Sequence, residues 1–144
     1  MNRTTPPFVL GGVVDGDAPP PAKFEVVEPD VKGPIPATPR QKVACMMRLI
    51  VPEGGALPTS VSVFFRDAGG GPLGNYPMKP ASKEGNAYTL GYLMRAPIAS
   101  GKYALIYETT YLVRPHPKIA GAPAPNPVEH RSSVKAAEVE VSGR

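Results

Sequence analysis

The feature that most constrains the fold is a two-residue alternation of apolar and polar side chains in the stretches that lack proline. The 144 residues include 20 prolines, which crowd the first forty residues and the stretch from Pro115 to Pro127. Proline cannot continue a helix or donate a hydrogen bond within a central strand, so it marks the connections. Because the remaining stretches alternate with a period of two and none sustains a helical period, we expect an all-β fold.

The alternation outlines six to seven strands. We expect strands that begin at Lys23, that cover residues 42–51, 60–66, 88–94, 101–114 and 133–141, and a short edge strand around Tyr76 and Met78. A break of parity at Ala136 and Ala137 predicts a β-bulge in the last of them. Short strands separated by turns are typical of an antiparallel β-sandwich, either immunoglobulin-like or a jelly roll.

One segment supports the first of these architectures. Residues 96–105 resemble the corner and following strand of immunoglobulin-like domains, in which a tyrosine follows a turn that contains glycine, here Gly101 and Tyr103. The resemblance implies that the Tyr103 hydroxyl bonds back to the backbone of the corner. With a single cysteine and no tryptophan, the chain lacks the disulfide and core tryptophan of antibody domains, so the resemblance concerns architecture only.

The chain divides into an extended Pro/Gly-rich arm, residues 1–22, and a β-sandwich domain, residues 23–144. Proline pairs and triplets enforce extended backbone in the arm. It nevertheless carries apolar residues that a solvated tail does not need, namely Phe8, Val9, Leu10, Val13 and Val14. These residues predict that the arm docks, either onto its own domain or onto a neighbouring chain.

Five of the six tyrosines fall on two expected strands. Aromatic pairs stabilise sheets, so packing in the core is the simpler interpretation. The alternative is a binding face, because tyrosine is enriched at protein interfaces. Together with the apolar residues of the arm, the candidate interface includes Tyr88, Tyr92, Tyr107 and Tyr111.

No motif predicts an active site. Residues 69–74 satisfy the spacing G-x-G-x-x-G, but Pro72 and Pro77 exclude the helix that a dinucleotide site requires. Asp15 and Asp17 lack the further oxygen ligands of a calcium loop, and Glu108 is interpreted as a residue of a polar strand face.

The possible zinc ligands are equally few. They are His116, His130, Glu129 and Cys45, and Cys45 lies on the apolar parity of its strand, which indicates a core position. We therefore expect no cofactor, no metal and no enzymatic activity.

Charge and hydropathy indicate whether the chain binds nucleic acid, spans a membrane or is exported. The net charge of +4 comes from scattered cations, whereas nucleic-acid binding needs clustered ones, so no nucleic-acid partner is expected. No apolar stretch approaches the roughly 20 residues of a membrane span. The first residues lack the apolar core of a signal peptide, so we expect synthesis in the cytoplasm.

Two functional hypotheses follow. The first is a non-enzymatic structural module that assembles with a protein partner or with itself, and that decorates a larger particle such as a viral or phage capsid or virion. The second is a carbohydrate- or small-ligand-binding β-sandwich that uses the tyrosine face. A small hydrolase is disfavoured by the shortage of histidine, cysteine and clustered acids.

Overall fold

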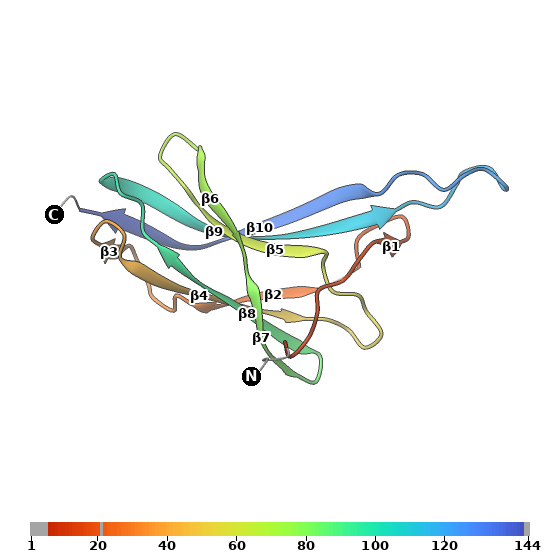
Figure 1. Ribbon diagram of the computed structural model, residues 1–144, viewed down its shortest axis with the longest axis horizontal. Helices are drawn as coiled ribbons and strands as arrows, with labels where there is room; N and C mark the ends of the chain where they lie inside the picture. Colours follow the sequence, from red (N-terminus) through yellow and green to blue (C-terminus); the bar gives the residue numbers. More distant parts are fainter. Residues whose placement is uncertain (1–5, 21, 143–144) are drawn as a thin grey trace, which may run out of the picture.

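The computed structural model describes residues 6–20 and 22–142 and confirms an all-β chain (Figure 1). The described residues form ten strands in two sheets, more than the six to seven expected. The strands are β1 (Val14–Asp15), β2 (Lys23–Glu28), β3 (Ile35–Ala37), β4 (Lys42–Ile50), β5 (Ser60–Arg66), β6 (Pro72–Pro77), β7 (Lys79–Glu84), β8 (Ala87–Arg95), β9 (Gly101–Arg114) and β10 (Val128–Val141).

The larger sheet has the order β3-β10-β9-β5-β6, with β1 added beside β9, and the smaller sheet has the order β2-β4-β8-β7. The expectation of a purely antiparallel arrangement is corrected by two parallel pairings, β1 with β9 and β10 with β3. In both, a very short strand pairs with the end of a long one. The expected bulge in β10 is confirmed, since the register shifts between Lys135 and Ala137.

The core lies between the two sheets, as the alternation requires. From the smaller sheet, Met47, Leu49 and Leu90 point inward, and all are almost fully buried. They meet the inward residues of the larger sheet, Val61, Val63, Phe65, Leu105, Tyr107 and Val139. Cys45 is buried in the same core, as its parity predicts.

The chain passes from one sheet to the other on both sides of the body. After β6, buried Met78 donates its N–H to Val61 O at 2.8 Å, and the chain then continues as β7 of the smaller sheet. On the opposite side β2 belongs to the smaller sheet, and β3 joins the larger one. These crossings cover the sides of the core.

Residues 6–16 of the expected arm lie against the body of their own chain. Phe8 is buried in the core and meets the Tyr88 ring edge-on, with ring centroids 5.1 Å apart. The N–H of Gly11 donates to Pro58 O at 2.9 Å. A side chain at position 11 would place its Cβ 2.3 Å from Leu57 O, so only glycine allows this close approach.

Candidate protein-binding groove

The residues of the expected interface occupy several different environments. Tyr107, Tyr111 and Phe8 are buried, Tyr88, Tyr92, Leu10 and Val14 are partly buried, and Val9 and Val13 are exposed. The four tyrosines point into the space between the sheets, two from β8 and two from β9. The structure therefore does not gather them into one exposed row, and core packing accounts for most of their surface.

The tyrosine hydroxyls bind backbone atoms. Tyr103 donates to Ala99 O at 2.7 Å, which confirms the contact implied by the resemblance of residues 96–105. Tyr111 donates to Ala56 O at 3.1 Å. Tyr107 donates to Glu28 O and accepts from Met46 N, so it links the two sheets.

A groove of about 430 Å³ opens at the end of the body where β6, the β3–β4 turn and the β8–β9 turn meet. Phe65, Met94, Ala96 and Tyr103 are the buried residues that line this end groove. Its rim consists of exposed apolar residues with two arginines, namely Leu73, Tyr76, Ile98, Arg40 and Arg95. The sequence indicated Tyr76 as part of an edge strand, and it indicated none of these rim residues as part of an interface.

The walls of the end groove are held in place by contacts behind them. The Tyr103 ring packs edge-on against Phe65 at a centroid distance of 6.3 Å, and its hydroxyl fixes the turn that carries Ile98. On the other side Tyr76 stacks on Tyr92, with centroids 5.3 Å apart and planes 13° apart. The groove is thus supported by aromatic pairs before anything binds.

Exposed cations border the end groove. Arg40 and Arg95 line it, and Lys42 lies directly opposite Arg95 in the pairing of β4 with β8. Among the described residues, none of these three cations forms an ion pair. Like charges placed opposite each other on neighbouring strands repel, so an acidic group bound here would relieve that repulsion.

Arg40 has a left-handed backbone conformation, with φ of 64°. Its N–H donates to Ala96 O at 3.1 Å, which ties the β3–β4 turn to the groove. An L-residue in this conformation costs about 1–2 kcal/mol that glycine avoids. The turn would therefore be easier to form with glycine, and the arginine supplies a cation at the groove instead.

We predict that Arg40→Gly leaves the free energy of unfolding unchanged or raises it by up to about 1 kcal/mol. Arg95→Gly removes the same charge from a strand, where glycine costs about 0.5–1 kcal/mol. Urea denaturation of both variants checks this. Equal destabilisation by the two changes would show that the conformation of Arg40 carries no strain.

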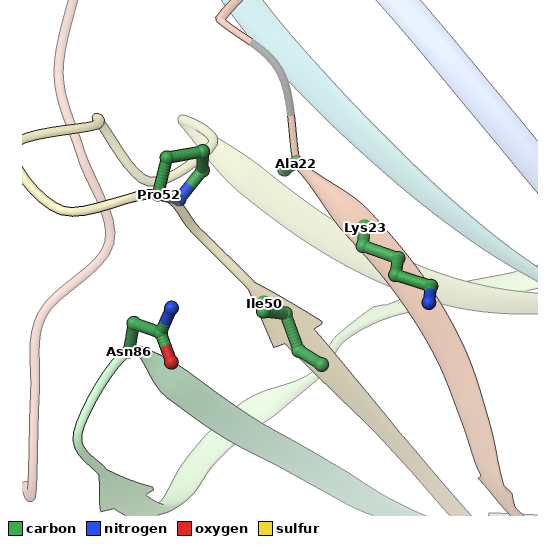
Figure 2. A pocket seen from close by; sticks show the side chains of 5 residues that line it. All are labelled: Ala22, Lys23, Ile50, Pro52 and Asn86. Atoms are coloured by element: carbon green, nitrogen blue, oxygen red, sulfur yellow. The ribbon is translucent and has the colours of Figure 1, made fainter.

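A second pocket, of about 450 Å³, lies beside the ends of β2 and β4 (Figure 2). Figure 2 shows the side chains of Lys23, Ile50, Pro52 and Asn86 spread apart from one another, and Lys23 is the one titratable side chain among the five lining residues. These five described residues provide neither a nucleophile with a base nor a charged cluster. It is a weaker candidate than the end groove.

Among the described residues, Cys45, His116 and His130 lie on different elements. Burial raises the pKa of the Cys45 thiol to about 11, so the thiolate that a nucleophile requires is scarce at neutral pH. The described residues contain no group of three histidine, cysteine or acidic side chains that could hold a metal ion. They also contain no helix that is long and apolar enough to cross a membrane.

The glycine-rich segment closes the β5–β6 hairpin. Asp67 Oδ1 accepts from Gly71 N at 2.9 Å, and Gly74 takes a φ of 69° where the pairing of β5 with β6 shifts register. His116 lies in the exposed β9–β10 loop, and His130 is partly buried on β10.

Comparison of the chain with models of protein families, with curated proteins and with solved structures finds no match.

Proposed function

We propose that the chain is a non-enzymatic structural module that docks onto a larger protein particle, such as a viral or phage capsid or virion. The observation that carries this proposal is the end groove, which combines exposed apolar side chains with arginines that have no ion-pair partner among the described residues. We further propose that its occupant is an acidic segment of a partner protein that inserts an apolar side chain.

Three exposed apolar side chains lie together on the rim of the end groove. The exposed fractions are 40% for Leu73, 46% for Tyr76 and 65% for Ile98, and all three border one groove. Single exposed apolar residues are ordinary, but a contiguous set with a polar margin marks an interaction site. Tyrosine and arginine are also the residues enriched at the centres of protein interfaces.

We also propose that the two sheets form an immunoglobulin-like sandwich and not a jelly roll. The orders β2-β4-β8-β7 and β3-β10-β9-β5-β6 correspond to the strand order of immunoglobulin domains, with β6 as the extra strand of the variable type. The bond from Tyr103 at the start of β9 to the preceding corner supports the same assignment. In the variable type the binding loops correspond to β4–β5 and β9–β10, so the end groove, which is lined by the β3–β4 and β8–β9 turns, lies at the other end of the sandwich.

Backbone pairing with a partner is disfavoured around the end groove. Strand β6 has Pro72 and Pro77 at its ends and a shift of register in its middle. Prolines and bulges protect an edge strand against the addition of another strand. The partner is therefore expected to contact side chains, and its acidic groups would set the orientation.

A peptide titration followed by NMR tests the proposal. The probe is a synthetic peptide in which leucine and phenylalanine alternate with aspartate, and a peptide with lysine in place of aspartate is its control. We expect the acidic peptide to shift the amide resonances of Leu73, Tyr76, Arg95 and Ile98, and Arg95→Glu to weaken its binding by about tenfold or more. Lys118→Glu, in the exposed β9–β10 loop, makes the same change of net charge and serves as the control.

Two results would overturn the docking proposal. One is the absence of shifts at millimolar peptide, and the other is equal binding of both peptides, since the cations would then play no part. The stacked Tyr76 and Tyr92 rings favour the second hypothesis, a carbohydrate or small ligand, to the extent that rings offer a flat apolar face. Shifts of these residues with oligosaccharides alone would replace the docking proposal by that one.

A further inference from the structure

Strand β10 has a long open edge. On one side it pairs with β9 over its whole length, and on the other it pairs with β3 only at Val139, Glu140 and Val141. In the part of the chain that the structure describes, no strand covers the outer side of residues 128–138. Figure 1 shows the β9–β10 hairpin reaching beyond the end of β5, with its connecting loop projecting furthest.

The hydrogen bonds of β9 show which backbone groups of β10 face outward. Thr110 O accepts from Thr59 N, and Leu112 N donates to Thr59 Oγ1, so the even-numbered residues of β9 direct their backbone groups toward β5. Because these directions alternate along a strand, the odd-numbered residues of β9 face β10.

The register then assigns the outer edge. Ser132 lies opposite Thr109, so the even-numbered residues of β10 before the bulge face β9. The residues whose N–H and C=O groups point away from β9 are therefore Glu129, Arg131, Ser133 and Lys135. Their side chains are exposed on the outer face of the sheet.

The other sheet edges are protected, and this one is not. Strand β3 has three residues including a proline, β6 and β7 contain prolines and shifts of register, and β2 has a shift of register. From Val128 to Val141 there is no proline, and the one bulge lies near the β3 end. An unprotected edge of this length is a template for another strand.

We propose that this edge pairs with the same edge of a second copy of the chain, antiparallel and centred on Ser132. A two-fold axis at Ser132 places Glu129 opposite Lys135 of the second copy, and by symmetry Lys135 opposite its Glu129. The same axis places Arg131 opposite Ser133 of the second copy. The outward N–H and C=O groups of the two edges can then pair with each other.

Neighbouring registers are less favourable. Centring the pair on Arg131 opposes two arginines, and centring it on Ser133 opposes Arg131 to Lys135. Like charges directly opposite destabilise a strand pair, whereas opposite charges stabilise it. In the single chain Glu129 pairs with Arg131 at 3.0 Å, and Lys135 pairs with Glu138. The proposed register would extend these two pairs into one row of alternating charge.

The inference rests on the proposed assembly role, but it does not involve the end groove, so the two can fail separately. Sedimentation velocity of the full chain from micromolar to millimolar concentration tests it. We expect a monomer–dimer equilibrium in which E129K or K135E raises the dissociation constant about tenfold. The double variant E129K/K135E should restore dimerisation to within about threefold, because the cross-chain pairs form again.

Ser133→Pro is the second test, because it removes an outward N–H without breaking a hydrogen bond to β9. It should abolish the dimer while circular dichroism shows an unchanged fold, and Glu53→Lys should leave the dimer intact. A chain that is monomeric at millimolar concentration overturns the inference and leaves the end groove untouched. So does a dimer that withstands Ser133→Pro and both charge reversals, since its interface then lies elsewhere.

Discussion

Replacing Phe8 by alanine is expected to lower the free energy of unfolding by about 3 kcal/mol. The Phe8 side chain is only 8% exposed, belongs to the core cluster and contacts the Tyr88 ring. Truncating it removes this apolar contact and leaves a cavity at the side of the body. Residues 6–16 would then be held by the packing of Leu10 and by a few hydrogen bonds, among them the one from Gly11 to Pro58.

Val9→Ala is the matched control, because Val9 is 77% exposed and adjacent in the chain. Its effect should stay within about 0.5 kcal/mol. Urea denaturation followed by circular dichroism measures both variants. Should Phe8→Ala cost no more than Val9→Ala, the N-terminal segment would be an appendage, and the body would be stable without it.

This contrast shows what the sequence of the segment could not predict. Phe8 and Val9 are adjacent apolar residues among prolines and glycines, and no periodicity distinguishes the inward residue from the outward one. The path of the segment across the body depends on the close approach of Gly11 to Leu57, and these two residues are far apart in the chain. The sequence predicts that the segment docks, and the structure places it on its own chain.

The long strands were predictable because one face of each is buried. In β9 the odd-numbered residues from Tyr103 to Val113 all face the core, as the alternation requires. The bulge of β10 was predictable for the same reason, since parity changes at Ala136. Both follow from side chains that alternate between two faces.

The short edge strands β3 and β7 were missed, as was the beginning of β10. Pro36 and Pro80 lie inside β3 and β7, and their presence argued for connections. At an edge, however, a proline can occupy a position whose N–H has no strand beside it. Residues 128–132 carry little apolar character, and they become strand because β9 offers them a paired neighbour.

The end groove was not predictable from the sequence. Its rim combines Arg40, Leu73, Tyr76, Arg95 and Ile98 from three separate parts of the chain, and only the fold brings them together. The sequence did contain a weak signal, an isoleucine in the proline-containing turn before Gly101. An apolar residue in such a turn has no strand partner, so it is either buried by another element or left on the surface.

The hydroxyl of Tyr107 forms a polar link between the two sheets inside the core. It leaves the larger sheet and reaches the smaller one, where it donates to Glu28 O and accepts from Met46 N at 3.2 Å. The register of β2 against β4 shifts between Val26 and Glu28, beside this contact. Burial raises the pKa of the Tyr107 hydroxyl above its ordinary value, so the group stays protonated and can donate.

Tyr107→Phe is therefore expected to lower the free energy of unfolding by about 2 kcal/mol, because a carbonyl and an N–H lose their partner while the ring still fills its place. Tyr92→Phe, which keeps the stack on Tyr76, should cost less than about 0.5 kcal/mol. Urea denaturation with an unchanged m-value would measure the difference. If the two variants proved equally stable, the bulge at Glu28 would be held by packing alone, and the sheets would need no polar link between them.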